Sequence, residues 1–231
     1  MAFKTKTDYY NLAIANKVIL TDTTENKTSQ TATAQGEDGF IVAEEVFGTY
    51  EAPSENLTIV ADLAAGDLSP VLGKVNAVGT KKYVLGSFSI TTGAGQQPTV
   101  SASGREVNAA ATDGCKCTVA VPAVTRLHHA QNFGAFTLSG TGAHLTQCTF
   151  QAQGQINVAT KDGEVINFDF TGGTITVSGT VQVSDSGYGE PTITPASGYK
   201  LTSPLSCTNP DADFPTYTFT LTKNLAADSA N

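Results

Sequence analysis

Four cysteines are the residues of this 231-residue chain best suited to bind a metal ion. Cys115 and Cys117 flank one residue, which places both thiols on the same side of an extended strand. A structural zinc site needs four ligands, and its cysteine pairs are usually separated by two to four residues. Cys148 and Cys207 could complete a set of four, but nothing in their spacing demands it. We therefore expect reduced, buried core thiols and no metal site.

Three histidines are the remaining candidates for acid–base chemistry. His128 and His129 are adjacent, so on a helix they would point apart and could not share a metal ion. His144 follows Gly142-Ala143, at a predicted hairpin turn. No Gly-x-Ser-x-Gly elbow occurs, and no acid or nucleophile is an evident partner for a histidine. The sequence therefore predicts no catalytic residue and no enzyme activity.

Two further segments approximate ligand-binding motifs but fail at defining positions. The segment 66–75 has six residues between its glycines instead of four, and Val75 stands where a P-loop requires Ser or Thr. The segment Asn209-Pro-Asp211-Ala-Asp213 has the alternating oxygen ligands of a calcium loop, but Phe214 occupies the glycine position. A turn is expected there, because Asx side chains bond their own backbone. We expect no cofactor.

Alternating apolar residues predict the strands that would position these groups. The clearest run lies between residues 147 and 184, with apolar positions at Cys148, Phe150, Ala152, Ile166, Phe168, Phe170, Ile175, Val177, Val181 and Val183. Two glycine-containing segments, Lys161-Asp162-Gly163 and Gly172-Gly173, are predicted turns within the run. A period of two with Asp-Gly and Gly-Gly turns predicts an antiparallel meander with one buried face.

The first half of the chain repeats parts of this pattern. Residues 31–42, around Asp38-Gly39, resemble residues 157–166, around Asp162-Gly163, and residues 83–91 resemble residues 217–222. Both pairs imply nearly the same offset along the chain. A repeat of this length predicts two related β modules.

Further strands and connections are expected in the first half. Val84, Gly86, Phe88 and Ile90 alternate cleanly, and Cys115, Cys117, Val119 and Val121 are expected on one face of a strand that Pro122 ends. Residues 21–39 predict a loop or a polar hairpin, and residues 62–80 a glycine-punctuated connection. Residues 7–17 could form a short capped helix or an extended arm that docks on a neighbour.

A helix is predicted over residues 123–133, with Thr125 as its cap and Leu127 and Ala130 on one face. The predicted organisation is an N-terminal β module with an N-terminal arm over 1–122, a helical connector over 123–133 and a C-terminal β module over 134–231. The predicted fold class is all-β, with two related antiparallel β-sandwich or barrel modules joined by a short helix.

Composition and charge restrict the function classes. The net charge is −8, which argues against a phosphate-binding surface and sequence-specific nucleic-acid binding. Charged residues make up 15% of the chain, below the roughly 25% of ordinary soluble domains. This suits either sheets that carry Thr on their solvent faces or a surface covered by partner subunits.

The acidic residues are unevenly placed. No Lys or Arg occurs between Lys27 and Lys74, a stretch that contains Glu37, Asp38, Glu44, Glu45, Glu51, Glu55, Asp62 and Asp67. The stretch suits a solvated acidic surface or an acidic wall that repels passing nucleic acid. The N-terminus has no signal-cleavage pattern and no apolar run could span a bilayer, so synthesis in the cytoplasm and no membrane partner are expected.

Residues 83–104, 145–150 and 204–217 carry a resemblance to a protein family. The amino-acid sequence of these segments resembles that of uncharacterised structural proteins of tailed phages and prophages of gut bacteria. The resemblance extends over about residues 30–225. The resemblance implies a non-enzymatic structural role and a place in the virion after synthesis in a host bacterium. If the virion matures outside the cell, a disulfide between Cys148 and Cys207 is an alternative to two reduced thiols.

The resemblance does not say which part of the particle the chain would form. Tail tubes are stacked rings of small β barrels, so two similar modules in one subunit suit a trimeric ring with pseudo-sixfold symmetry, or a hexamer. Further copies of the chain and other virion proteins are the expected partners. The alternatives are a capsid decoration or baseplate protein and, more distantly, a carbohydrate-binding β module or adhesin, which the absence of Trp disfavours.

Overall fold

The structure, a computed structural model, describes residues 6–35, 41–126, 129–161, 164–184, 189–208, 210, 213–226 and 228. Within these ranges it describes the backbone alone for residues 30–35, 41–49, 160, 161 and 164. The described residues form thirteen strands and no helix, so none of them belongs to a helix that could cross a lipid bilayer. The all-β prediction is confirmed.

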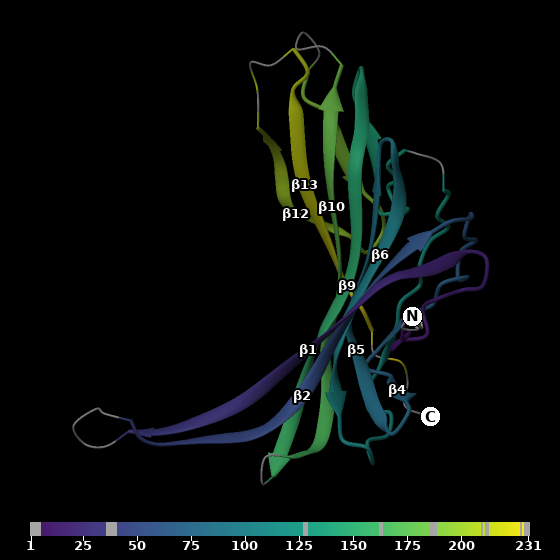
Figure 1. Ribbon diagram of the computed structural model, residues 1–231. Helices are drawn as coiled ribbons and strands as arrows, with labels where there is room; N and C mark the ends of the chain where they lie inside the picture. The colour runs from purple at the N-terminus through teal and green to yellow at the C-terminus, as the bar shows by residue number, and fades with distance from the viewer. Residues whose placement is uncertain are drawn as a thin grey trace.

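Nine strands form one antiparallel sheet, in the order β1-β2-β6-β5-β9-β10-β13-β12, with β4 paired to β5 (Figure 1). Two small sheets, β3–β7 and β8–β11, complete the fold. The bounds of the strands are β1 (Val18–Gln35), β2 (Ile41–Ile59), β3 (Val71–Leu72), β4 (Val75–Val78), β5 (Lys81–Gly93), β6 (Gln96–Val107), β7 (Cys117–Thr118), β8 (Phe136–Ser139), β9 (Ala143–Lys161), β10 (Glu164–Val183), β11 (Thr192–Pro195), β12 (Lys200–Cys207) and β13 (Thr216–Asn224).

The sheet runs without interruption across the predicted module boundary. β5 pairs with β9 from Ser87↔Gln153 to Gly93↔Gln147, so the two halves of the chain share one sheet. One core cluster also draws buried residues from both halves. The chain is therefore not built as two separate sandwiches joined by a helix.

The helix predicted over residues 123–133 is wrong. Residues 123–126 and 129–133 are irregular, and Val124 forms an isolated bridge with Leu63. Val124 and Phe133 are buried, so their side chains anchor an extended segment over the sheet instead of forming one face of a helix. Leu127 and His128 lie outside the described residues.

The strand order of the sheet repeats. Each half contributes two hairpins, and the last strand of the second hairpin pairs with the last strand of the first. The resulting orders are β1-β2-β6-β5 and β9-β10-β13-β12. The Asp-Gly pairs of the sequence repeat fall between β1 and β2 and between β9 and β10, in residues outside the described ranges. The second sequence echo instead aligns β5 with β13, which occupy different places in this order.

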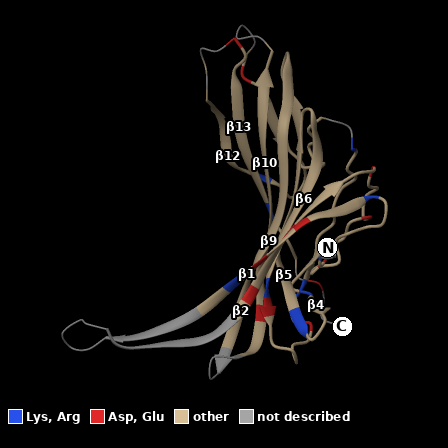
Figure 2. Cartoon of the chain, viewed as in Figure 1, with Lys and Arg blue, Asp and Glu red and all other residues tan. Residues whose placement is uncertain are grey.

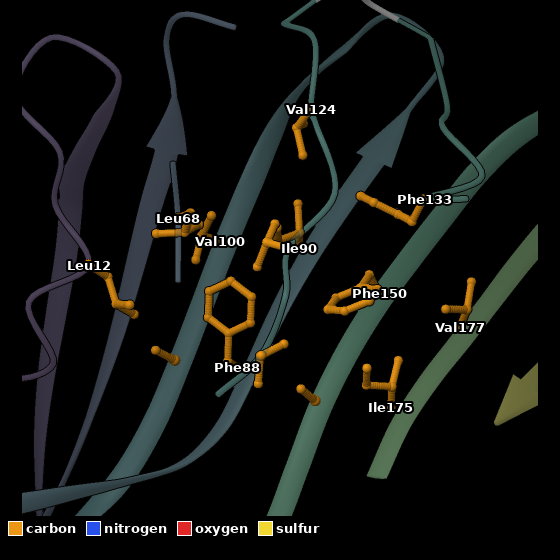
Figure 3. Close-up of a cluster of buried hydrophobic side chains, with 14 of the residues drawn as sticks. Leu12, Leu68, Phe88, Ile90, Val100, Val124, Phe133, Phe150, Ile175 and Val177 are labelled. Carbon is orange, nitrogen blue, oxygen red and sulfur yellow. The ribbon is translucent and has the colours of Figure 1, made fainter. Parts of the chain in front are cut away.

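The main hydrophobic core covers one face of the sheet. Phe88 and Ile90 of β5, Phe150 of β9 and Val177 of β10 point from the strands into it (Figure 3). Irregular segments close the core from the other side with buried residues that include Leu12, Leu63, Leu68, Val119, Val121, Val124 and Phe133. All of the predicted core positions between 147 and 184 are buried except Ile166, which is 55% exposed beside a register shift in β10.

Glycine-containing bulges account for two further departures from the predicted pattern. Gly172-Gly173, predicted as a turn, lies inside β10, where Thr171 pairs with Gln155 and Thr174 with Gln153. The extra residue makes a bulge and the strand continues. A second register shift, at Gly86 in β5, puts Leu85 in the main core and Val84 in a separate cluster with Val107 and Phe168.

The strand predicted around the first cysteine pair is shorter than expected. Only Cys117 and Thr118 are in a strand, β7. Cys117, Val119 and Val121 are buried as predicted, but Cys115 is exposed. The first two cysteines therefore do not share one environment.

Candidate assembly site at the β1–β2 arm

A long two-stranded ribbon leaves the body of the molecule (Figure 1). β1 and β2 pair from Val18↔Ile59 to Gln35↔Ile41, whereas β2 pairs with β6 only from Ser54 to Thr58. We call residues 28–35 and 41–50 the outer arm, and residues 18–27 and 51–59, from which it extends, the root of the arm. At about 3.3 Å per residue, the outer arm is about 30 Å long.

The outer arm has the physical properties of an assembly element. An isolated two-stranded hairpin is marginally stable in water, and both of its edges present unpaired N–H and C=O groups. Within the described residues, the backbone of the outer arm hydrogen-bonds in ladders only between β1 and β2. A protein strand that paired with either edge of the arm would satisfy these groups.

The sheet has a second end strand at β12. Its pairing with β13 is irregular, and Lys200 and Pro204 interrupt its edge. Such features discourage edge-to-edge pairing. Exposed apolar residues nevertheless occur on both end strands, Ile19 at 50% exposure on β1 and Leu201 at 39% on β12.

The N-terminal segment packs across the root of the arm. Residues 7–17 form turns and no helix, with both oxygens of Asp8 accepting N–H groups of residues 12 and 13 at 3.0 and 2.9 Å. Tyr9 and Tyr10 are buried. The Tyr9 hydroxyl donates to Glu25 Oε1 at 2.5 Å, and the Tyr10 hydroxyl donates to the carbonyl of Pro53 at 2.7 Å. The segment thereby connects β1 and β2 to the core. In this structure residues 7–17 pack on their own chain.

A charged network holds the other side of the root. Lys81 Nζ lies 2.8 Å from Glu51 Oε1 and 3.2 Å from Glu106 Oε1. Tyr83 donates its hydroxyl to Glu51 Oε2 at 2.6 Å, and its ring packs edge-on against Tyr9. Hydrogen bonds from Lys81 and then Tyr83 lower the pKa of Glu51, and the bond to Glu51 raises the pKa of Lys81. Figure 2 shows charged residues gathered near this root, beside β4 and β5.

A fully buried acid completes the root. Glu55 on β2 is 0% exposed, and its Oε1 accepts the N–H of Tyr9. Its Oε2 is buried with no hydrogen-bond partner among the described residues. Burial, with a smaller contribution from the charge of Asp8, raises the pKa of Glu55 to about 7. Glu51 and Glu55 therefore belong to the interior of the root and not to a solvated acidic surface.

The second face of the sheet is polar and almost uncharged. Side chains on this face come from alternate positions of β6, β5, β9 and β10 and are Thr99, Ser101, Ser103, Ser87, Ser89, Thr91, Thr149, Gln151, Gln153, Thr176, Ser178 and Thr180. Thr91 and Thr149 bond across strands through hydroxyls 3.1 Å apart. This sheet face carries hydroxyl and amide groups in place of charged ones, which accounts for part of the low charged share of the chain.

The cysteines and histidines that sequence motifs singled out are dispersed. All four cysteines are free, with Cys148 buried in the core and Cys207 half-buried. Burial raises the pKa of Cys148 to about 12. His144 is exposed on β9, and His129 is exposed beside a cavity of about 550 Å³ whose described lining has no acid or thiol. No three His, Cys, Asp or Glu residues of the described ranges are grouped as metal ligands would be.

The approximate motifs have structural roles or lie outside the described residues. In the P-loop-like segment, Asp67 pairs with Lys17 at 2.5 Å and accepts the N–H of Ala64 at 2.8 Å, which fixes a turn before β3. No helix follows it, as a P-loop would require. Asn209 and Asp211 of the calcium-like segment lie outside the described residues.

The root was not anticipated from the sequence, although a signal was present. Glu55 stands in phase with Leu57 and Ile59, the buried positions of β2. An acid in phase with core residues is costly to bury unless it has a specific environment. The alternation of Glu55 with Leu57 and Ile59 was therefore the sequence signal for a buried carboxyl group.

Comparison with known proteins adds no relative. No protein-family model matches the chain. A search of curated proteins finds no match either.

Proposed function

We propose that this chain is a non-enzymatic, self-assembling structural protein of a bacteriophage virion, and that it forms a ring of the tail-tube type. The observation that carries the proposal is the outer arm, about 30 Å of two-stranded ribbon with open edges. An arm of this length reaches well beyond its own subunit, and the unpaired edges favour a protein partner. A neighbouring copy is the partner always present at the same concentration.

The repeated strand order supports a ring in which each chain supplies two similar units. We propose that β1-β2-β6-β5 and β9-β10-β13-β12 are related repeats, so that a trimer would have pseudo-sixfold symmetry; a hexamer is the alternative. The Asp-Gly pairs located between the first two strands of each half favour this relationship.

The charge distribution suits a particle through which DNA passes. The net charge of −8 disfavours adhesion of nucleic acid, and the polar sheet face offers no cluster of basic groups. Glu51 and Glu55 point into the protein and cannot face passing DNA. An acidic surface that repels DNA would therefore consist of the other acidic residues between 37 and 67.

Capsid decoration and baseplate roles would use the same arm and differ in copy number and neighbours. A carbohydrate-binding module receives less support, because such sites use clustered exposed aromatic rings. Among the described large apolar residues, Phe214 is the exposed aromatic, while Tyr9, Tyr10 and Tyr83 are buried.

Removal of the outer arm tests the proposal. Thr28 pairs with Tyr50 across the arm, so residues 29–49 can be replaced by Asn-Gly, which favours a tight hairpin turn. We expect the wild-type chain to form rings or stacked rings at high concentration, seen by negative-stain electron microscopy and light scattering. The shortened chain should stay monomeric, with a circular dichroism spectrum that is reduced only by the strand residues removed.

The result that opposes the proposal is equally direct. A wild-type chain that stays monomeric at millimolar concentration would contradict self-assembly. Identical rings from the wild-type and shortened chains would show that the arm does not carry it.

A further inference from the structure

A cleft lies where the large sheet divides into ribbons. The pairing of β5 with β9 stops at Ser87↔Gln153, the pairing of β2 with β6 stops at Ser54↔Ser103, and Ser87 pairs with Ser103. Beyond this level β1–β2, β5–β6 and β9–β10 continue as separate ribbons. A cavity of about 600 Å³ occupies the division, lined by residues of β2, β6, β5, β9 and β10.

The cleft contains an arginine, Arg105, with two guanidinium nitrogen atoms that have no hydrogen-bond partner among the described residues. These atoms are Nε and Nη2, and both are buried. The guanidinium carbon lies 3.9 Å from the ring centroid of Tyr50, and burial lowers the pKa of Arg105. Unsatisfied buried donors are rare in native proteins, and for a charged group they are costly.

The chemistry of the two free nitrogens is specific. Nε and Nη2 form one edge of the guanidinium with two parallel N–H donors, the edge that binds a carboxylate through two hydrogen bonds. The described lining of the cleft has no acidic residue, and its other polar groups are Ser, Thr, Gln and Tyr. The cleft therefore carries one uncompensated positive charge in a chain of net charge −8.

We propose that Arg105 and the walls of this cleft form a carboxylate-binding site, and that its ligand is an acidic side chain from the outer arm of a second copy. The occupant rests on the self-assembly proposed above. Glu44 and Glu45 are consecutive in β2 within the outer arm, and no Lys or Arg occurs in residues 28–73. The arm and the cleft are therefore complementary in charge.

The backbone of the cleft also suits an extended segment. Past Gln153, β9 pairs only with β10 in the described residues, so its edge toward β5 is free. An arm strand could add to this edge through main-chain hydrogen bonds. The Nε and Nη2 atoms of Arg105 are closed to solvent in this conformation, so a ligand would have to open the cleft at the side chains that line it.

The first experiment tests the carboxylate chemistry independently of assembly. The chain has two arginines, Arg105 and Arg126, so its proton–nitrogen correlation spectrum contains two Nε–Hε signals, which Arg126→Lys assigns. In the chain whose residues 29–49 are replaced by Asn-Gly, which lacks Glu44 and Glu45 and is expected to stay monomeric, we expect sodium acetate to shift the Arg105 signal with saturation, while sodium chloride at the same ionic strength does not. Equal shifts with both salts would overturn the site.

The second experiment tests the arm as the source of the carboxylate. Arg105→Gln and the double variant Glu44→Gln/Glu45→Gln should each raise the concentration for half-assembly by roughly tenfold or more, because each removes one member of a desolvated pair. Arg126→Gln is the matched control, since this arginine is exposed and lies outside the cleft. Charge exchange, with Arg105→Glu and Glu44→Arg/Glu45→Arg in one chain, should restore assembly.

The two experiments separate the possible failures. If Arg105→Gln assembles at the wild-type concentration and keeps the wild-type circular dichroism, the arm is not the ligand, although self-assembly stands. If the wild-type chain never assembles while acetate moves the Arg105 signal, self-assembly and the second copy are both refuted, and the carboxylate site remains.

Discussion

Replacement of Glu55 by Gln should change how the stability of the protein depends on pH. Glu55 is fully buried, Tyr9 donates its N–H to Oε1, and burial raises the pKa of the carboxyl to about 7 from its ordinary 4.5. Because the folded state favours the protonated form, this group contributes its full stability below about pH 4.5. That contribution is lost as the pH rises through about 7.

The size of the effect follows from the two pKa values. The difference between about 7 and 4.5, at about 1.4 kcal/mol per pKa unit, corresponds to about 3 kcal/mol of unfolding free energy. Glu55→Gln cannot ionise and keeps an acceptor for the Tyr9 N–H. The difference in unfolding free energy between variant and wild type should therefore shift by about 3 kcal/mol in favour of the variant between pH 4.5 and pH 8.5.

Urea unfolding followed by far-ultraviolet circular dichroism measures this difference at a series of pH values. A constant penalty from the buried amide N–H groups adds equally at every pH, so the readout is the change with pH. Glu190→Gln, at an exposed position, is the control and should show no comparable change. A Glu55→Gln difference that stays constant from pH 4.5 to 8.5 would refute a buried, proton-binding carboxyl group.

Two other substitutions or modifications test the packing. Gly154→Ala should destabilise the fold by about 2 kcal/mol in urea titrations, because a Cβ there would lie 2.1 Å from the Phe170 ring, whereas Gly114→Ala, with open space around it, should be near neutral. Native protein treated with a thiol reagent should react first at exposed Cys115 and last at buried Cys148, as mass spectrometry of the labelled peptides can show; equal rates would contradict the described burial.

The sequence was sufficient for the strands whose apolar residues alternate without interruption. Phe150 and Ala152 on β9 and Ile175 and Val177 on β10 are buried as predicted, and the hairpin between Lys161 and Glu164 is where the Asp-Gly pair indicated. These features are local, since side-chain alternation and turn chemistry depend on neighbouring residues.

The remaining features depend on contacts distant in sequence. Glycine marks bulges as well as turns, so Gly172-Gly173 could not be assigned without knowing that β9 continues alongside. β1 has little apolar alternation and is a strand because β2 pairs with it. The free donors of Arg105 lie where two strand pairings, β5 with β9 and β2 with β6, end at the same level of the sheet, and no local sequence pattern predicts this.

The pairing of β5 with β9 has a consequence for synthesis of the chain. When the ribosome has completed β5, residues 94–142 must still be translated before β9 can begin to emerge. At 5–20 residues per second this takes roughly 3–10 s. During that interval the edge of β5 that will pair with β9 is open, so we expect premature contacts between chains to be most frequent among nascent chains on the same polysome.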